Sequence, residues 1–238
     1  MSWRVLTYHK RVALLSLVSV PLFGFSGGAS ATMMRLELLT PQGDLVTSET
    51  YNKLFTIQGV VMVWFFLIPS IPTVLGNFLL PLMIGAPDMA LPRMNHWSFW
   101  ILPFAFTLLL STLFVPGGAP AGGWTMYPPL MLQGGANVAM VVFAIHMMGI
   151  SSIMGAINII ATILNMRAPG MDLLTMPIFV WSWLIPALLL IPVMPLLAGA
   201  VHMLLTDYFL GPRFFTLAAA GDRGVAPRHS RCLVLHPR

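Results

Sequence analysis

The stretch "TYNKLFTIQGVVMVWFFLIPSIPTVLGNF" (Thr50–Phe78) decides the fold class of this chain. No Asp, Glu, Lys or Arg stands between Lys53 and Asp88, and a helix of about 20 apolar residues is long enough to cross a bilayer. Gln58 stands about one turn inside this run and is followed by Gly59. Because a polar side chain at such a depth is costly, Gln58 is a candidate functional residue.

The composition of the whole chain indicates a membrane protein. Of its 238 residues 58% are hydrophobic and only 8% are charged, whereas about 25% of the residues of a soluble domain are charged. The single cysteine, Cys232, excludes an internal disulfide framework and a Cys-based metal site. We predict an all-α integral membrane protein with about five transmembrane helices, at residues 12–34, 54–84, 97–115, 137–166 and 177–205.

The basic residues predict how the chain is oriented, because Lys and Arg are enriched in cytoplasmic loops. Arg4, Lys10 and Arg11 predict a cytoplasmic N-terminus, and the net acidic loop after the first span then lies outside. The other basic residues are scattered, so that contact with membrane lipid explains the net charge of +5 better than nucleic acid does.

Two groups of polar residues have competing interpretations. Arg35 and Glu37, at the outer end of the first span, are most simply an interfacial anchor. A second group lies toward the inner side and serves either helix packing or a file of water that passes protons. Its members are Asn77, Asp88, Asn95, Ser151, Ser152 and Asn158.

The histidines do not predict a local metal site. His146 and His202 fall within predicted spans, and His9 and His96 fall near inner ends. No two of the six histidines lie four residues apart on one helix, as a di-histidine metal site on one helix requires. The simpler interpretation of each is a hydrogen-bonded structural residue.

Seven stretches spread over Tyr8–Asp222 carry a resemblance to a known family. They read "YHKRVALL", "MRLELLTPQGDL", "LGNFLLPLMIGAPDMALPRMN", "GGWTMYPPL", "SSIMGAINIIATILNMRAPGM", "MPIFVWSW" and "LAGAVHMLLTD". In this order they resemble subunit I of the haem–copper cytochrome c oxidases, a bundle of twelve membrane helices of which this chain matches the first five. The resemblance implies a bacterial plasma membrane protein of the aerobic respiratory chain that works with subunits II and III.

In that family, electrons pass from cytochrome c through a dinuclear copper and a low-spin haem to a high-spin haem–copper pair, where oxygen is reduced to water. Asp88 matches the carboxylate at the mouth of a proton-uptake path, the D channel. The side chains that would continue this path are Asn77, Asn95, Ser151, Ser152 and Asn158. Arg35 matches an arginine that hydrogen-bonds a substituent of the low-spin haem, and Trp124 and Tyr127 resemble the outer loop that roofs the haem.

Gln58 departs from the family. The family has an axial histidine ligand of the low-spin haem at this position, followed by a small residue. An amide oxygen is a poor neutral donor to haem iron, so we expect weak or absent coordination by Gln58. A single nucleotide change converts His to Gln, so a mutation or a sequencing error explains it equally.

The last residues depart as well. The family continues into a sixth helix with "HLFWF" and then "HPEVY", which supply a copper ligand and its cross-linked tyrosine, but here "RGVAPRHSRCLVLHPR" follows Asp222. The basic segment 223–238 would lie outside the membrane, and its His229 and His236 do not replace the copper ligands. We interpret it as an out-of-frame or truncated end, although a disordered tail or another number of spans also explains its arginines.

The resemblance therefore predicts an N-terminal fragment of a proton-translocating cytochrome c oxidase that has no oxidase activity alone. Three alternatives stay open at this point. They are a fragment of a quinol oxidase, a non-catalytic membrane interaction or assembly remnant, and a five-helix transporter, although we find no inverted repeat of the kind that transporters use.

Overall fold

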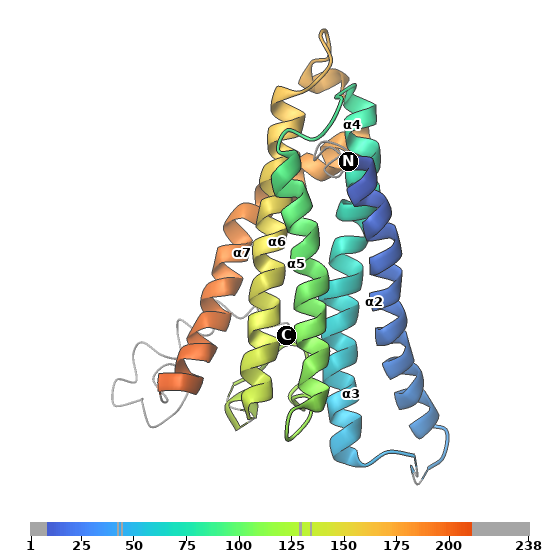
Figure 1. Cartoon of the computed structure of the whole chain (residues 1–238), viewed down its shortest axis with the longest axis vertical. Coiled ribbons are helices and arrows are strands. Elements are labelled where there is room, and N and C mark those ends of the chain that lie inside the picture. Colours follow the sequence, from blue (N-terminus) through green and yellow to red (C-terminus); the bar gives the residue numbers. More distant parts are fainter. Residues whose placement is uncertain (1–8, 42, 44, 129, 134, 211–238) are drawn as a thin grey trace, which may run out of the picture.

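The computed structural model describes residues 9–210, except 42, 44, 129 and 134. In this part the chain is helical and has no strands, and five helices are long and apolar enough to cross a membrane (Figure 1). They are α2 (His9–Glu37), the continuous helix Ser48–Ile84, α5 (Pro92–Ser111), α6 (Ala136–Asn165) and α7 (Ile178–Leu210). The predicted all-α membrane architecture is confirmed. Segment 223–238, with His229 and His236, lies outside the described residues.

The second span changes its helical type along its length. It consists of α3 (Ser48–Val60), the π-helical segments η1 (Val61–Leu67) and η2 (Ser70–Gly76), and α4 (Asn77–Ile84). The turns on both sides of Pro69 are widened into π turns. The Ile68 N–H bonds the Val63 carbonyl, five residues back. Wide turns accommodate a proline, which lacks an N–H and clashes with the carbonyl four residues before it.

The segments between the spans contain three 3₁₀ turns, η3 (Thr112–Phe114), η4 (Leu130–Gln133) and η5 (Leu173–Thr175). Thr47 caps the second span, since its hydroxyl accepts the Thr50 N–H at 3.3 Å. The same span ends at Gly85, whose φ of 71° is the left-handed geometry that favours glycine after a helix. These local signals place the turn that follows Gly85.

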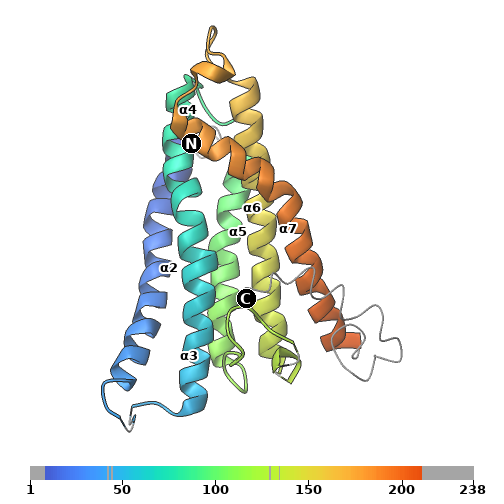
Figure 2. The ribbon, with the colours of Figure 1, turned by 180° about the vertical axis from the view of Figure 1, so that it is seen from behind.

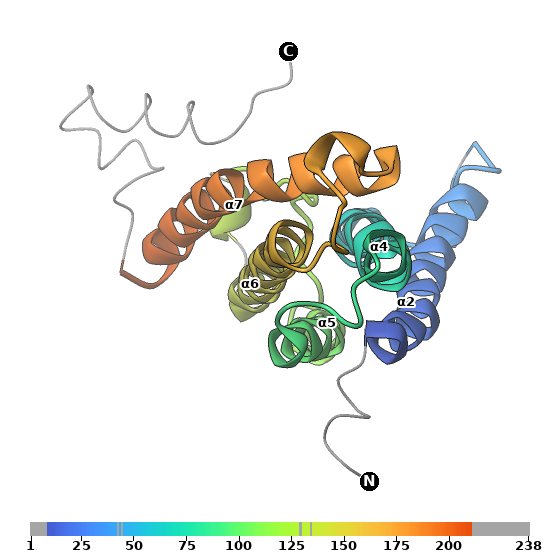
Figure 3. The same ribbon diagram turned by 90° about the horizontal axis from the view of Figure 1, so that it is seen from above.

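Successive helices run in opposite directions, so the first residues of α2, the turn after α4 and the turn before α7 meet at one end of the bundle (Figures 1 and 2). Viewed from above, α4, α5 and α6 stand together, with α2 and α7 on opposite sides (Figure 3). The most extensive packing is between α5 and α6 and between α6 and α7. This arrangement brings the turn after α4 between α2 and α6.

Two apolar clusters fill the bundle. One contains three interlocking rings, in which the ring centroids of Phe23 lie 4.3 Å from Phe106 and 6.1 Å from Phe65. The other lies around Leu80 and Ile84 of α4, Ile163 of α6 and α7. The larger apolar side chains that remain exposed lie mostly on the outward helix faces, as expected for a protein in lipid.

Glycine allows α2 to approach the second span closely. A β-carbon at buried Gly27 would lie 2.8 Å from the Met62 Sδ and 3.1 Å from a Val61 methyl. The next residue, Gly28, has no atom within 4 Å of the same position. Small residues at such contacts are the usual means of helix association in membranes.

We therefore predict opposite results from two adjacent substitutions. Gly27→Leu is expected to lower the free energy of unfolding by about 1–3 kcal/mol, the typical cost of overpacking. Gly28→Leu, which points into open space, is expected to be neutral or stabilising, because leucine has the higher helix propensity. Thermal unfolding of both purified variants in detergent measures the difference, and equal losses would contradict the close contact.

Candidate functional site

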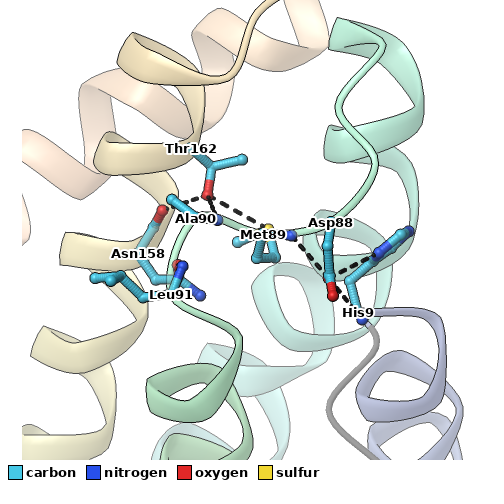
Figure 4. A network of polar contacts seen from close by, with 7 residues as sticks. All are labelled: His9, Asp88, Met89, Ala90, Leu91, Asn158 and Thr162. Carbon is cyan, nitrogen blue, oxygen red and sulfur yellow. Dashed lines mark hydrogen bonds and ion pairs between the residues drawn. The ribbon is translucent and has the colours of Figure 1, made fainter. Parts of the chain in front are cut away.

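Asp88 joins the turn after α4 to the first turn of α2. Its Oδ1 accepts the backbone N–H of His9 at 3.0 Å and of Met89 at 2.8 Å, and lies 3.1 Å from the His9 Nδ1 (Figure 4). The side chain of Asp88 is 20% exposed and that of His9 is 4% exposed. The carboxylate thus reaches solvent, and its negative charge interacts favourably with the positive N-terminal end of the α2 dipole.

The environment of Asp88 favours its ionised form. Partial burial raises the pKa of Asp88, but it is outweighed by hydrogen bonds from the His9 ring and from the amides of Met89 and His9. The net result is a pKa below the ordinary value of a carboxyl. Asp88 is therefore a carboxylate at neutral pH.

The next two residues are bonded to α6. The Ala90 N–H donates to the Thr162 Oγ1 and the Leu91 N–H donates to the Asn158 Oδ1, both at 2.9 Å (Figure 4). The Thr162 hydroxyl in turn donates to the Asn158 carbonyl at 2.6 Å. Both side chains are fully buried, so residues 88–91 are fixed between α2 on one side and α6 on the other.

Behind this segment lies a cavity of about 310 Å³ between the second span, α5, α6 and α7. Four of the six polar residues that the sequence groups together line it, and Ser98 of α5 joins them. The polar lining consists of Thr73, Asn77, Asn95, Ser98, Ser151 and Ser152, among mostly apolar residues. Asp88 and Asn158 do not line it, whereas Met89 does. The structure therefore gathers most of the group, with Met89 between Asp88 and the cavity.

Two buried amides in this region have unused hydrogen-bonding capacity. The Nδ2 atoms of Asn95 and Asn158 are buried and have no partner among the residues that the structure describes. The Ser151 hydroxyl, by contrast, donates to the Ser98 carbonyl at 2.7 Å, which leaves its oxygen able to accept. Buried donors of this kind are usually bonded to ordered water, and the cavity has room for several molecules.

Gln58 lies near a different contact, at the opposite end of the bundle. Gly59 is covered by Trp124, because a β-carbon at Gly59 would lie 2.8 Å from the Trp124 Cδ1. The buried Thr56 hydroxyl accepts the Gly123 N–H at 2.9 Å. The loop of Trp124 is thus attached to α3 directly beside the half-buried Gln58.

The residues around Gln58 do not fit a haem with an axial protein ligand at this position. The only functional group at residue 58 is a carboxamide, and the span Ser48–Ile84 contains no histidine. Exposed Tyr127 lies in the loop of Trp124, and Arg35 is exposed at the end of α2. Nearby Glu37 is buried, and its Oε2 accepts the N–H groups of Leu45 and Val46 at 2.9 Å.

Several contacts of the site were not predicted from the sequence. Thr162 and Ser98 were missed because a lone hydroxyl within an apolar helix is a common residue. The bond of His9 to Asp88 links positions 79 residues apart, and only the charge pair offered a signal. The rings of His146 and His202 also meet across α6 and α7, with their centroids 6.0 Å apart.

The Asp88 contact predicts a pH-dependent stability. Since the pKa of Asp88 is below its ordinary value, its stabilising effect is present above about pH 4, the ordinary carboxyl value, and is lost as the pH falls through the folded-state pKa. Asp88→Asn is therefore expected to lower the melting temperature at pH 7. The difference from the unchanged chain is expected to shrink in acid, and a difference that stays constant down to pH 3 would contradict this.

Comparison with known proteins identifies the family. The family model described as Cytochrome C and Quinol oxidase polypeptide I matches residues 11–238, a range that includes segment 223–238. The chain is 41% identical over 230 residues to "Cytochrome c oxidase subunit 1" of Synechocystis sp., an alignment that covers 96% of this chain and 41% of that protein.

A second relative, the protein of the same name from Cereibacter sphaeroides, is 37% identical over 252 residues, with 92% of this chain and 44% of the relative covered. The chain thus spans about two fifths of the length of both relatives. Since the family model matches nearly the whole chain, the chain belongs to the cytochrome c and quinol oxidase polypeptide I family.

Proposed function

We propose that this chain is a piece of the catalytic subunit of a proton-translocating cytochrome c oxidase and forms the entrance of a proton-uptake path. The observation that carries the proposal is the cavity lined by Asn77, Asn95, Ser151 and Ser152, directly behind the segment that Asp88 anchors. The family description covers cytochrome c and quinol oxidases, and we propose cytochrome c as the donor because both relatives carry that name.

In this proposal Asp88 takes a proton from the aqueous phase. Its pKa is held low, so it is ionised when a proton arrives, and its side chain still reaches solvent. The proton then leaves Asp88 for water on the far side of residues 88–91. The unpaired Nδ2 of Asn158 supports a water molecule there, next to the bonded Leu91 N–H.

Beyond Asn158 the proton would move along water in the cavity. The unpaired Nδ2 of Asn95 donates to such water, and Ser151, whose own proton is bonded to the Ser98 carbonyl, accepts from it. Amides and hydroxyls of fixed orientation do not titrate near pH 7 themselves. They hold the water chain in place, and the proton moves through the water.

The rest of the oxidase belongs to the proposal as well. We propose a multi-pass protein of the bacterial plasma membrane with a cytoplasmic N-terminus, so that Asp88 faces the cytoplasm. Haem and copper would supply the electron transfer and the reduction of oxygen in the complete enzyme, together with subunits II and III. The chain alone is proposed not to reduce oxygen, since it spans about two fifths of its relatives.

A complementation experiment tests the proton path. The chain is co-expressed with the part of the Cereibacter sphaeroides relative that it does not match and with that bacterium's partner subunits, and oxygen uptake is measured in membranes. Asp88→Asn is expected to reduce the rate by about 10²-fold, the lower end of what a positioned proton donor contributes. Asn95→Leu, which leaves Asp88 intact, is expected to slow uptake similarly.

Asp172 provides the matched control for this experiment. It is an exposed carboxylate in the turn before α7, at the same end of the bundle as Asp88. Asp172→Asn is expected to leave the rate unchanged, and the chain expressed alone gives the blank. A full rate in Asp88→Asn, or equal losses in both aspartate variants, would refute the proposed path.

The haem region gives a separate prediction. Gln58→His places an imidazole, a common haem ligand, on the same half-buried face of α3. Added haem is expected to bind the purified Gln58→His chain at least ~10-fold more tightly, the factor that corresponds to about 1.4 kcal/mol. The absorption spectrum reports the binding. Val63→His, elsewhere on the same span, is the control, and equal binding by all three chains would contradict a ligand position at residue 58.

A further inference from the structure

A groove on the membrane-facing surface of α5 has no role in the proposed proton path. It measures about 560 Å³ and is lined almost wholly by apolar side chains. They are Trp97, Trp100, Ile101, Pro103, Phe104 and Thr107 of α5 and Met147 of α6. Trp97 is 68% exposed and Phe104 is 59% exposed, which is unusual for such large side chains unless lipid or protein covers them.

Polar and basic groups lie at one end of the groove. The Trp100 Nε1–H donates to the His96 Nε2 at 2.8 Å, so the other ring nitrogen, Nδ1, carries the proton of a neutral His96 and remains a donor. The half-buried Arg11 lies in the first turn of α2, a helix that packs against α5. Exposed Arg93 precedes Trp97 by four residues and therefore lies on the same face of α5.

Among the described residues, no carboxylate forms an ion pair with Arg11, Arg93 or His96. Oδ1 of Asp88 is engaged by His9 and the Met89 amide. Asp172 lies in the turn before α7, beyond α6. Arg11, Arg93 and the His96 N–H are therefore available to an anion at this end of the bundle.

The length of the groove matches one lipid chain. From Trp97 to Thr107 the helix rises about 15 Å, at about 1.5 Å per residue. The hydrocarbon core of a bilayer is about 30 Å thick, so the groove extends from one interface to the midplane. An acyl chain of a single leaflet has this reach, whereas a partner helix would need a groove along the whole span.

We propose that this groove binds one acidic phospholipid, with its phosphate between Arg11, Arg93 and His96 and one acyl chain along Trp97, Trp100 and Phe104. Tryptophan at the interface and basic residues at the headgroup level are the general means by which proteins hold anionic lipid. The headgroup lies at the same end of the bundle as Asp88, because Arg11 and His9 share the first turn of α2.

Quenching of tryptophan fluorescence by brominated lipid tests the proposal on the full chain. The chain is placed in nanodiscs of phosphatidylcholine with increasing fractions of phosphatidylglycerol whose acyl chains carry bromine. Brominated phosphatidylcholine is the matched probe. We expect half-maximal quenching at a several-fold lower fraction of the acidic lipid, since each basic residue near an anionic surface contributes about fivefold.

Three variants assign the quenching to the groove. Trp97→Phe/Trp100→Phe removes two of the seven tryptophans and is expected to remove the lipid-specific part of the quenching. Arg11→Gln/Arg93→Gln is expected to abolish the preference for the acidic lipid. Arg167→Gln, an arginine at the same end of the bundle outside the groove, is expected to keep it.

Four results would overturn the proposal, and each contradicts a different part of it. Equal quenching of the unchanged chain by both brominated lipids would mean that the headgroup is not recognised, and this comparison needs no variant to fold. A preference for the acidic lipid that persists in Trp97→Phe/Trp100→Phe would place the lipid elsewhere. The absence of quenching by either lipid would mean that protein covers the groove, and an equal loss in Arg167→Gln would reduce the effect to general surface charge.

Discussion

The arrangement of this protein depends on how the backbone from Asp88 to Leu91 is held inside the bundle. An irregular segment in an apolar environment must have its N–H groups bonded, because no bulk water replaces a missing partner. Three consecutive N–H groups meet this demand through side chains: the Asp88 carboxylate bonds the Met89 amide, and Thr162 and Asn158 bond the amides of Ala90 and Leu91. The same carboxylate also holds the first turn of α2.

These hydrogen bonds around residues 88–91 explain why the same residues serve both the stability of the fold and the proposed proton path. Asn158 is fixed by the Leu91 N–H through its oxygen, and its Nδ2 has no partner within the described part of the chain. Asp88 is ionised because the hydrogen bonds from the His9 ring and from the amides of Met89 and His9 lower its pKa. A side chain that serves the fold with one atom and offers another to water costs the protein little additional desolvation.

Much of the fold could be predicted from the sequence, because charged residues are costly to bury in a membrane and their absence from a long stretch indicates a spanning helix. The uncharged runs around Gln58, His146 and His202 predicted helices that the structure contains. The polar group around Asn95 was predicted from the sequence pattern and the family resemblance, and most of it does line one cavity. The depth of Gln58 marked it as unusual, and the structure places Trp124 and Gly59 beside it.

The remaining features depend on contacts between distant segments. No local pattern relates His9 to Asp88, or Thr162 to Ala90, since these pairs form only after the helices pack. The displacement of Asp88 from the cavity by Met89 likewise depends on how the turn is attached to α6. Helical periodicity assumes 3.6 residues per turn, so it could not anticipate η1 and η2.

The wide turns of η1 and η2 also affect how related sequences are aligned. A π turn holds one residue more than the α turn that it replaces, because its N–H reaches five residues back. A relative with one residue fewer between positions 61 and 76 can tighten such a turn and keep the same faces on both sides of it. In an ordinary α-helix the same deletion would rotate all later side chains by about 100°. A one-residue gap here is therefore compatible with an unbroken helix and with Asn77 still facing the cavity.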